Sequence, residues 1–363
     1  MTATTSASRI GPVSRIDPVT AYRRPTSVPG MLRLDSNEGV LPSRALLGDL
    51  ADADPELLRR YPDVSVLEAA LASRVGVAPD RALVTAGADE AIDRACRAFL
   101  DAGRAILLAE PSFDMFDCSA ALAGGELIRV PWWEKAFPID GFIERLDRRT
   151  AVVAVVSPNN PTGSVATLAD VRRLANAAPN ALVILDHVYV EYADEDLTPQ
   201  VLDLPNVLVL RTLSKAWGLA GCRVGYAVGS PYVIAVLRAA GGPYTVAAPS
   251  VALALSQLER GAAPLVAHVG RVREERRLLS GRLAAAGLAP RPSQANFVLV
   301  ECGPRAASIC AGLTAHGVLV RDFPAGRRGL ETALRITLPG NAPDFEQLSA
   351  ALERTLEAEG LQP

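Results

Sequence analysis

The chain has 363 residues, 49% of them hydrophobic, and a formal net charge of −3 at pH 7. This length predicts two domains, or one large domain with a smaller one, and the apolar half of the residues can fill a sizeable core. A slightly acidic chain without a long basic run is not typical of a nucleic-acid-binding protein. Its longest apolar runs fall far short of the ~20 residues of a membrane span, so we expect neither nucleic acid nor a membrane as partner.

The first residues of the chain are small and polar, without the apolar segment of a secretory signal. The five cysteines are scattered and form no CxxC pair, and the three histidines have no metal-ligand spacing. We therefore expect a protein of the reducing cytoplasm with neither a disulfide framework nor a metal site.

Residues 1–30 are rich in Pro, Ser, Thr and Arg, and we interpret residues 1–35 as an N-terminal arm. From about residue 65, segments with helical spacing alternate with short apolar runs. Helices are predicted at 65–76, 89–100 and 167–178, and strands at 82–87, 105–111, 125–131, 151–158, 181–187, 206–212 and 223–229. Apolar strands that alternate with helices indicate an α/β domain whose parallel or mixed sheet is covered on both faces.

The pattern changes near residue 230, where long arginine-rich helical stretches begin. They lead to separate strands predicted at 296–302, 317–323 and 333–339. We interpret this part as a smaller α+β domain. The predicted division is an arm at 1–35, a large domain at 36–245 and a small domain at 246–363, with a long linking helix at about 230–285.

Polar motifs follow the ends of several predicted strands, namely "TAGADE", "AEPSF", "SPNNPTG", "DHVY" and "RTLSK". In an open α/β sheet, ligands bind at the carboxyl ends of the strands, so these motifs can converge on one pocket. Each can also be an ordinary loop, and residues such as Asp89 and Asp186 can be simple helix caps. The chain has neither a GxGxxG nor a GxxxxGK[ST] motif, which argues against a dinucleotide or P-loop site.

One residue in "RTLSK" is unusual because only two of the 37 basic residues are lysines, Lys135 and Lys215. Arginine replaces lysine in most surface roles but cannot act as a neutral amine. A lysine retained next to an apolar strand therefore indicates amine chemistry, since burial and neighbouring cations lower the pKa of an amine.

The neighbouring motifs supply groups that are complementary to the parts of a single ligand. The turn before Asp89 can bind a phosphate at a helix N-terminus, and Arg223 offers a planar fork for the same anion. Asp186 ends an apolar strand and needs a cation, such as a protonated ring nitrogen. Asn160 and Tyr189 can hold a ring hydroxyl, and Lys215 can bond to an aldehyde. Pyridoxal 5′-phosphate carries all of these groups.

In this order, the motifs "YPD", "TAGADEAI", "EPSFDMF", "SPNNPTG", "D-x-x-Y" and "TLSKAWGLAGCRVGY" resemble those of fold-type I pyridoxal-phosphate enzymes. Within them, the chain resembles the class I/II aminotransferases, and most of all the histidinol-phosphate aminotransferases, from about residue 32 to 340. This resemblance implies a large domain with a mostly parallel seven-stranded sheet covered by helices, and a smaller α+β C-terminal domain. It also implies a cytoplasmic homodimer of amino-acid biosynthesis with shared active sites.

The resemblance further implies a role for individual residues. Lys215 would bond covalently to the cofactor aldehyde and act as general acid and base, and Asp186 would pair with the ring nitrogen. The ring oxygen would be held by Asn160 and Tyr189. The phosphate and ring contacts would come from Ala88, Asp89, Phe113, Thr212, Ser214 and Arg223, and from Tyr61 of a neighbouring subunit. The substrate side would comprise Arg335, Asn37, Tyr22 and Arg321, with Glu38 beside Asn37.

The reaction expected is transfer of an amino group from an amino acid or phosphorylated amine to a 2-oxo acid. The same scaffold also suits a decarboxylase, cyclase or oxidase of amino acids, because the substrate pocket decides which bond breaks. A non-catalytic ligand-binding relative is a third reading. The sequence assigns no role to His187 or to the pair Trp132 and Trp133.

Overall fold

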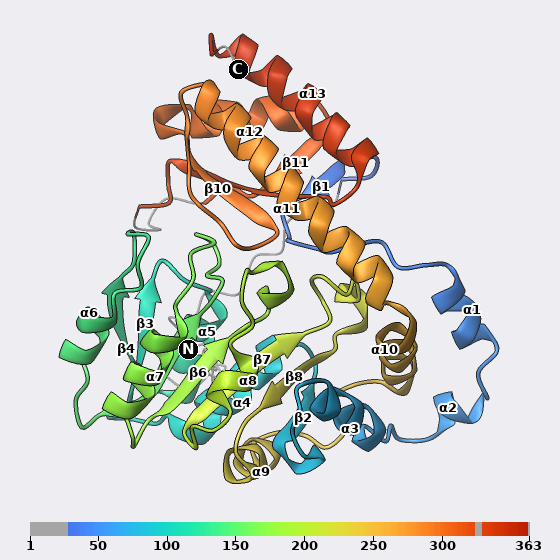
Figure 1. Cartoon of the computed structure of the whole chain (residues 1–363), viewed down its shortest axis with the longest axis vertical. Helices are drawn as coiled ribbons and strands as arrows, with labels where there is room; N and C mark the ends of the chain where they lie inside the picture. Colours follow the sequence, from blue (N-terminus) through green and yellow to red (C-terminus); the bar gives the residue numbers. More distant parts are fainter. Residues whose placement is uncertain (1–27, 324–328, 362–363) are drawn as a thin grey trace, which may run out of the picture.

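The computed structural model of the chain describes residues 28–323 and 329–361. In Figure 1 a large sheet with its helices fills the lower part of the molecule, and smaller sheets with two helices lie above it. The 24-residue helix α11 (Ala262–Ala285) runs between the two parts. Tyr22, predicted on the substrate side, lies outside the described residues.

The large sheet has seven strands in the order β2-β8-β7-β6-β5-β3-β4. All neighbours are parallel except β8, which runs antiparallel to both β2 and β7. This agrees with the expected mostly parallel seven-stranded sheet. The strands are β2 (Ala82–Thr85), β3 (Ala105–Glu110), β4 (Glu126–Pro131), β5 (Thr150–Val156), β6 (Leu182–Asp186), β7 (Val207–Thr212) and β8 (Gly225–Val228).

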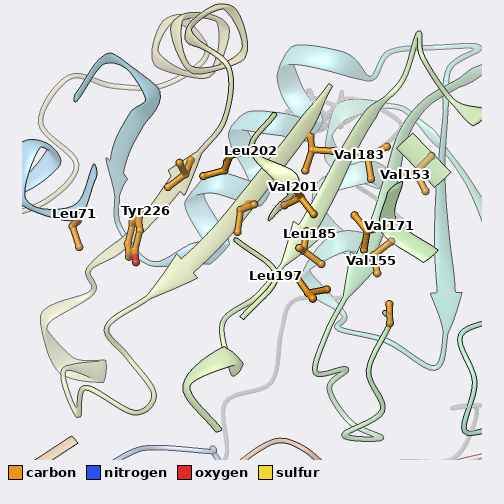
Figure 2. Close-up of a cluster of buried hydrophobic side chains, with 14 of the residues drawn as sticks. Leu71, Val153, Val155, Val171, Val183, Leu185, Leu197, Val201, Leu202 and Tyr226 are labelled. Carbon is orange, nitrogen blue, oxygen red and sulfur yellow. The ribbon is translucent and has the colours of Figure 1, made fainter. Parts of the chain in front are cut away.

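Helices cover both faces of this sheet because its central strands are apolar on both sides. In β6, Val183 and Leu185 face one buried cluster, and Leu182 and Ile184 face another. Figure 2 shows the first cluster, in which Val183 and Leu185 lie close to Val171 of a covering helix. That face packs against α3 (Ser65–Arg74), α7 (Leu168–Ala177), α8 (Thr198–Val201) and α10 (Ala248–Arg260), and the other face against α4 (Ala88–Phe99), α5 (Met115–Ala123) and α9 (Pro231–Ala239).

The smaller part contains two sheets. One pairs β1 (Leu32–Leu34) with β11 (Val318–Val320) in parallel, and the other has the antiparallel order β12-β10-β9. These three strands are β12 (Ala333–Thr337), β10 (Phe297–Glu301) and β9 (Ala289–Pro290), and the covering helices are α11, α12 (Ala306–Ala315) and α13 (Ala342–Ala358). An isolated bridge between Arg321 and Arg335 joins the end of β11 to β12.

The linking helix expected at about 230–285 is wrong as one continuous element. The chain forms α9, α10 and α11 there, separated at residues 240–247 and at Gly261. The first break contains Gly241, Gly242 and Pro243, and proline cannot continue a helix that needs its N–H group. Of these three helices, α11 is the one that runs between the two parts of the molecule.

The predicted division into arm, large and small domains stays a prediction. Within the described residues, β1 pairs with the smaller part, and the buried side of α10 belongs to the core of the large sheet. The remaining helices are α1 (Ala45–Ala51), α2 (Glu56–Arg59) and α6 (Ile139–Glu144), with 3-10 turns at Pro79–Arg81, Val190–Tyr192, Ala220–Cys222 and Gly303–Arg305. Among the helices described, none combines the length and the apolar character that crossing a membrane requires.

Candidate active site

A cavity of about 450 Å³ opens where β2, β5, β6 and β7 end and β12 faces them. These four strands share one direction, so their carboxyl ends meet at one edge of the sheet, as the motifs predicted. The predicted residues that line the cavity are Asn37, Ala88, Asp89, Phe113, Asn160, Asp186, Tyr189, Thr212, Ser214, Lys215, Arg223 and Arg335.

Lys215 follows β7 and directs its amine into this cavity. Its Nζ donates a hydrogen bond to the carbonyl of Ser36 at 3.2 Å and lies 5.6 Å from the centroid of the Tyr189 ring. Burial, reinforced by the positive charge of Arg335, lowers the pKa of Lys215 to about 8. An amine with this pKa is partly neutral near pH 7, as the isolated lysine of the sequence predicted.

The backbone around Lys215 is closely packed. A side chain added at Gly39 would place its Cβ 1.6 Å from the Lys215 carbonyl oxygen, so only glycine fits there. The segment after β1 therefore packs directly against the backbone of the lysine.

Asp186 ends β6 and is 1% exposed. Its Oδ1 accepts a hydrogen bond from the backbone N–H of Val188 at 3.3 Å. Burial raises the pKa of this carboxyl to about 7, because the loss of water around the charge outweighs the opposing effects of the Val188 N–H and the Lys215 charge. A cationic group in the cavity would restore the carboxylate form.

Two further polar groups face the cavity in fixed orientations. Arg335 Nη1 donates to Asn160 Oδ1 at 2.6 Å, which leaves the amide nitrogen of Asn160 to act as a donor. Asn37 Nδ2 donates to the hydroxyl of Tyr189 at 3.0 Å. Burial raises the pKa of Tyr189 to about 12, so this phenol keeps its proton.

The start of α4 forms an anion cradle with the loop after β7. The helix begins after Gly87, whose φ is +78°, and no described side chain caps it. Arg223 donates through Nη1 to Ser214 Oγ at 3.3 Å and through Nη2 to Asp89 Oδ2 at 3.2 Å. Asp89 is therefore not the simple helix cap that the sequence left open. Free N–H groups at a helix start beside a guanidinium suit a phosphate.

Glycine also allows β8 to pass beneath this cradle. A Cβ at Gly225 would lie 2.4 Å from the carbonyl carbon of Gly87 and 2.5 Å from the backbone nitrogen of Ala88. Thr212 lines the same end of the cavity, but its hydroxyl donates to the Val224 carbonyl at 3.3 Å and accepts from the Ser214 N–H at 3.1 Å.

On the opposite side, Arg335 of β12 is 8% exposed, and its Nη2 donates to the carbonyl of Asp35 at 2.7 Å. Arg321 exchanges backbone hydrogen bonds with Arg335, at 3.0 and 2.8 Å. Residues directly opposite in an antiparallel bridge project from the same face, so both arginines lie on one side of the smaller sheet. Arg321 does not line the cavity within the described residues.

The similarity of the chain to known proteins identifies its family. Residues 30–354 match the sequence profile of the family described as aminotransferase class I and II. The chain belongs to the class I and II aminotransferases. It is a pyridoxal-phosphate-dependent aminotransferase with the fold-type I architecture, as the sequence predicted.

Curated relatives of this aminotransferase include proteins named aromatic amino acid aminotransferase. That of Mycobacteroides abscessus is 34% identical over 330 residues, covering 89% of this chain and 94% of the relative. That of Mycolicibacterium smegmatis is also 34% identical over 330 residues, covering 88% of each.

Among solved structures, histidinol-phosphate aminotransferase from Sinorhizobium meliloti in complex with pyridoxal-5′-phosphate is 27% identical, with a TM-score of 0.80. The match covers 90% of this chain and 91% of that one. A protein described as a putative histidinol-phosphate aminotransferase, from Erwinia carotovora, is 26% identical, with a TM-score of 0.81 over 91% and 96% of the two chains.

The residues of the aminotransferase cavity fit pyridoxal 5′-phosphate. The buried carboxyl of Asp186 needs a cation, and the cradle at Ala88 and Arg223 can accept an anion. Between them lies an amine of lowered pKa, Lys215. The cofactor carries a ring nitrogen, a phosphate and an aldehyde, which match these three groups.

The aminotransferase uses His187 for local packing, away from the cavity. Its Nε2 accepts from the Leu197 N–H at 3.3 Å, so its Nδ1 carries the proton that it donates to the carbonyl of Ser157. Burial lowers the pKa of His187 to about 4, which keeps the ring neutral. His187 thus connects the ends of β5 and β6 beside Asp186.

The two tryptophans have different surroundings. Trp132 is buried and packs edge-on against Phe137, with ring centroids 5.1 Å apart. The ring of Trp133 lies 4.8 Å from the Arg291 guanidinium carbon, and its carbonyl accepts from Arg291 Nη1 at 2.7 Å. Trp133 therefore packs the loop after β4 against the smaller sheet.

Thr337 and Asn296 are residues of the site that the sequence motifs did not predict. Thr337 Oγ1 donates to Asn37 Oδ1 at 2.9 Å, and Asn296 Nδ2 donates to the Asn37 carbonyl at 3.2 Å. The two-residue period of a strand places Thr337 on the same face as Arg335, a signal that could have identified it. Nothing in the sequence around Asn296 distinguishes it.

Proposed function

We propose that this aminotransferase transfers the amino group of an L-amino acid with an aromatic or imidazole ring to a 2-oxo acid. The proposal rests chiefly on Arg335, a buried guanidinium that faces the same cavity as the Lys215 amine and can bind the substrate carboxylate in two-pronged fashion. Met115 adds an apolar side chain to the cavity that a substrate ring can contact. The names of the relatives that are 34% identical point in the same direction.

A phosphorylated donor such as histidinol phosphate, which the resemblance to histidinol-phosphate aminotransferases suggests, has the same combination of ring and anion. Arg321 is the group in the described residues best placed to favour it, because Arg321 projects from the same face as Arg335. Of these two arginines, Arg335 lines the cavity formed by the described residues and Arg321 does not. A single arginine suits a donor with one carboxylate better than a donor that also carries a phosphate.

When bound, the cofactor would supply an aldehyde that bonds to an amine and a ring that withdraws electrons from the reacting carbon. In this proposal Ala88, Asp89, Ser214 and Arg223 hold its phosphate, and Asp186 keeps its ring nitrogen protonated. Asn160 and Tyr189 donate to the ring oxygen. Thr212 supports this site through the backbone, and Phe113 packs against the ring.

Lys215 Nζ would be the group that bonds to the aldehyde and holds the cofactor in place. Its amine, when free, would take the proton from the substrate α-carbon, for which its lowered pKa suits it. Arg335 holds the substrate carboxylate meanwhile. The segment that contains Gly39 packs against the Lys215 backbone and helps to fix the position of this residue.

The proposal includes a homodimer with shared active sites. Exposed apolar side chains gather on and near α1, α2, α3 and α10, where Tyr61 stacks on Tyr244 with ring centroids 4.4 Å apart. Tyr61 is 78% exposed and Leu58 is 76% exposed. A second copy would cover these side chains, and Tyr61 would reach the phosphate in the neighbouring cavity. Leu58→Arg should produce a monomer, as measured by light scattering, with weaker cofactor binding.

The substrate assignment is tested by mixing the purified holoenzyme with a single donor and no acceptor. Phenylalanine, tyrosine, histidinol phosphate and aspartate are compared through the loss of the yellow cofactor band and the growth of the near-ultraviolet band of the aminated form. We expect the highest kcat/KM for an aromatic donor. A preference of ten-fold or more for histidinol phosphate or aspartate would contradict the assignment.

A further inference from the structure

Three buried side chains from distant parts of the chain form a continuous hydrogen-bonded series that ends in the cavity. Thr337 Oγ1 donates to Asn37 Oδ1 at 2.9 Å, and Asn37 Nδ2 donates to the Tyr189 hydroxyl at 3.0 Å. Their exposed fractions are 2%, 1% and 3%. Water therefore cannot easily replace any one of the three.

The series has a direction that follows from the chemistry of each group. A threonine hydroxyl has a single proton, and here it goes to the amide oxygen of Asn37. The amide nitrogen of Asn37 then faces Tyr189 and can only donate. The Tyr189 oxygen accepts this bond, so its own proton must point to another acceptor. Tyr189 lines the cavity, which is the side left for that proton.

Asn37 cannot leave this arrangement easily. Its φ is +56°, in the left-handed region that asparagine tolerates better than most residues. Its backbone N–H donates to Thr337 Oγ1 at 3.2 Å, and its carbonyl accepts from Asn296 Nδ2 at 3.2 Å. Both ends of the side chain and both backbone groups of Asn37 therefore have partners within the protein.

We propose that Thr337 is a positioning residue that acts through Asn37 to turn the hydroxyl of Tyr189 into the cavity, as a hydrogen-bond donor to the ring oxygen of the cofactor. The inference deepens the proposed function and depends on the role given there to Tyr189. It also changes the role expected for Asn37, whose amide orients Tyr189 rather than the substrate.

The test compares Thr337→Val with Thr337→Ser and Tyr189→Phe, all with the cofactor bound. Valine has the shape of threonine but cannot donate to Asn37, whereas serine can. A hydrogen bond donated to the ring oxygen stabilises its deprotonated form, so losing it shifts the pH midpoint of the cofactor absorbance upwards. We expect an upward shift of roughly 0.5–1 pH unit for Thr337→Val, from the usual strength of one hydrogen bond. Thr337→Ser should match the unmodified enzyme.

The double variant Thr337→Val with Tyr189→Phe tests whether Thr337 acts through Tyr189. Its midpoint should equal that of Tyr189→Phe alone, because the two changes remove the same interaction. In turnover, Thr337→Val should lower kcat about 3- to 10-fold and change KM for the donor less than two-fold. If the valine variant does not fold, Asn37→Asp replaces it, since a carboxylate cannot donate to Tyr189, and the midpoint should again rise.

The outcomes separate this inference from the proposed function. An unchanged midpoint for Thr337→Val beside a shifted one for Tyr189→Phe would overturn the inference alone. A shift in the double variant larger than that of Tyr189→Phe would also overturn it, as would a fall in melting temperature without any change in midpoint. If Tyr189→Phe and Lys215→Ala both left the cofactor absorbance unchanged, the proposed function itself would be wrong.

Discussion

The two sides of the cavity are built in different ways. On the side of the large sheet, Asn160, Asp186, Tyr189 and Lys215 each lie at or just after the end of a parallel strand, so the topology alone brings them together. On the opposite side, contacts join residues 300 positions apart, such as Arg335 with Asp35 and Thr337 with Asn37. The difference teaches that the side proposed to hold the cofactor depends on the sheet, whereas the side proposed to hold the substrate depends on how the smaller part docks.

The largest expected effect is on the sheet side, from Lys215→Arg. Arginine keeps the positive charge but offers no neutral amine, so turnover should fall at least ~10³-fold and the covalent link to the cofactor should be lost. Turnover and cofactor absorbance measure this. The matched control is Lys135→Arg, at the other, exposed lysine, which should behave normally. A normal rate in Lys215→Arg would remove the basis of the assignment.

Asp186→Asn should reduce kcat by roughly 10²–10³-fold, because a neutral amide does not hold a proton on the ring nitrogen. Without cofactor the same change should stabilise the chain at pH 8. The pKa of Asp186 is raised to about 7 by burial, above its ordinary 3.8, so the charged carboxyl destabilises the folded state as pH rises above about 4. Melting temperatures of the cofactor-free proteins at pH 8 and pH 4 check the sign. A lower melting temperature for the variant at pH 8 would contradict it.

Arg335→Ala tests the docked side, and its effect should appear mainly in KM. Loss of a charge-assisted bond to the substrate carboxylate should raise KM about 10- to 100-fold. Steady-state kinetics with a monocarboxylate donor measure this. Arg321→Ala is the control on the same face and should change KM less than about three-fold for that donor. A larger effect of Arg321→Ala with histidinol phosphate would move the substrate assignment toward phosphorylated donors.

The smallest effect concerns pH. With a pKa of about 8 for Lys215, the neutral fraction rises about five-fold from pH 7 to pH 8 and less than two-fold above it. The rate at which cofactor-free protein captures pyridoxal phosphate should follow this curve in stopped-flow absorbance. A rate that kept rising ten-fold per pH unit up to pH 10 would mean that burial does not lower the pKa of the Lys215 amine.

The sequence predicted the sheet side well because its information is local. Each functional residue there directly follows an apolar strand, and a buried carboxyl or a rare lysine at such a position has few ordinary explanations. Asp186 and Lys215 were therefore recognisable, together with the mostly parallel seven-stranded sheet that the family resemblance implied. The glycines and the proline at residues 240–247 are likewise a local signal for the break in the expected long helix.

The docked side was less predictable because its contacts are not local. Arg335 was identified through the motif around it, whereas the link from Thr337 to Asn37 requires two segments from opposite ends of the chain to meet. Trp133 shows the same limit, since its partner Arg291 lies 158 residues away. No periodicity or motif in the sequence predicts such a contact between distant residues.

The passage of the segment around Gly39 between Lys215 and β12 has a consequence for how the enzyme is made. Asp35 and Asn37 are synthesised 300 residues before Arg335 and Thr337, the side chains that hold them in place. Domains otherwise fold as they emerge, beginning with the N-terminal one. A nascent chain can thus complete its large sheet long before its reactive amine is covered, and a product truncated before residue 333 should fold its core yet fail as a catalyst.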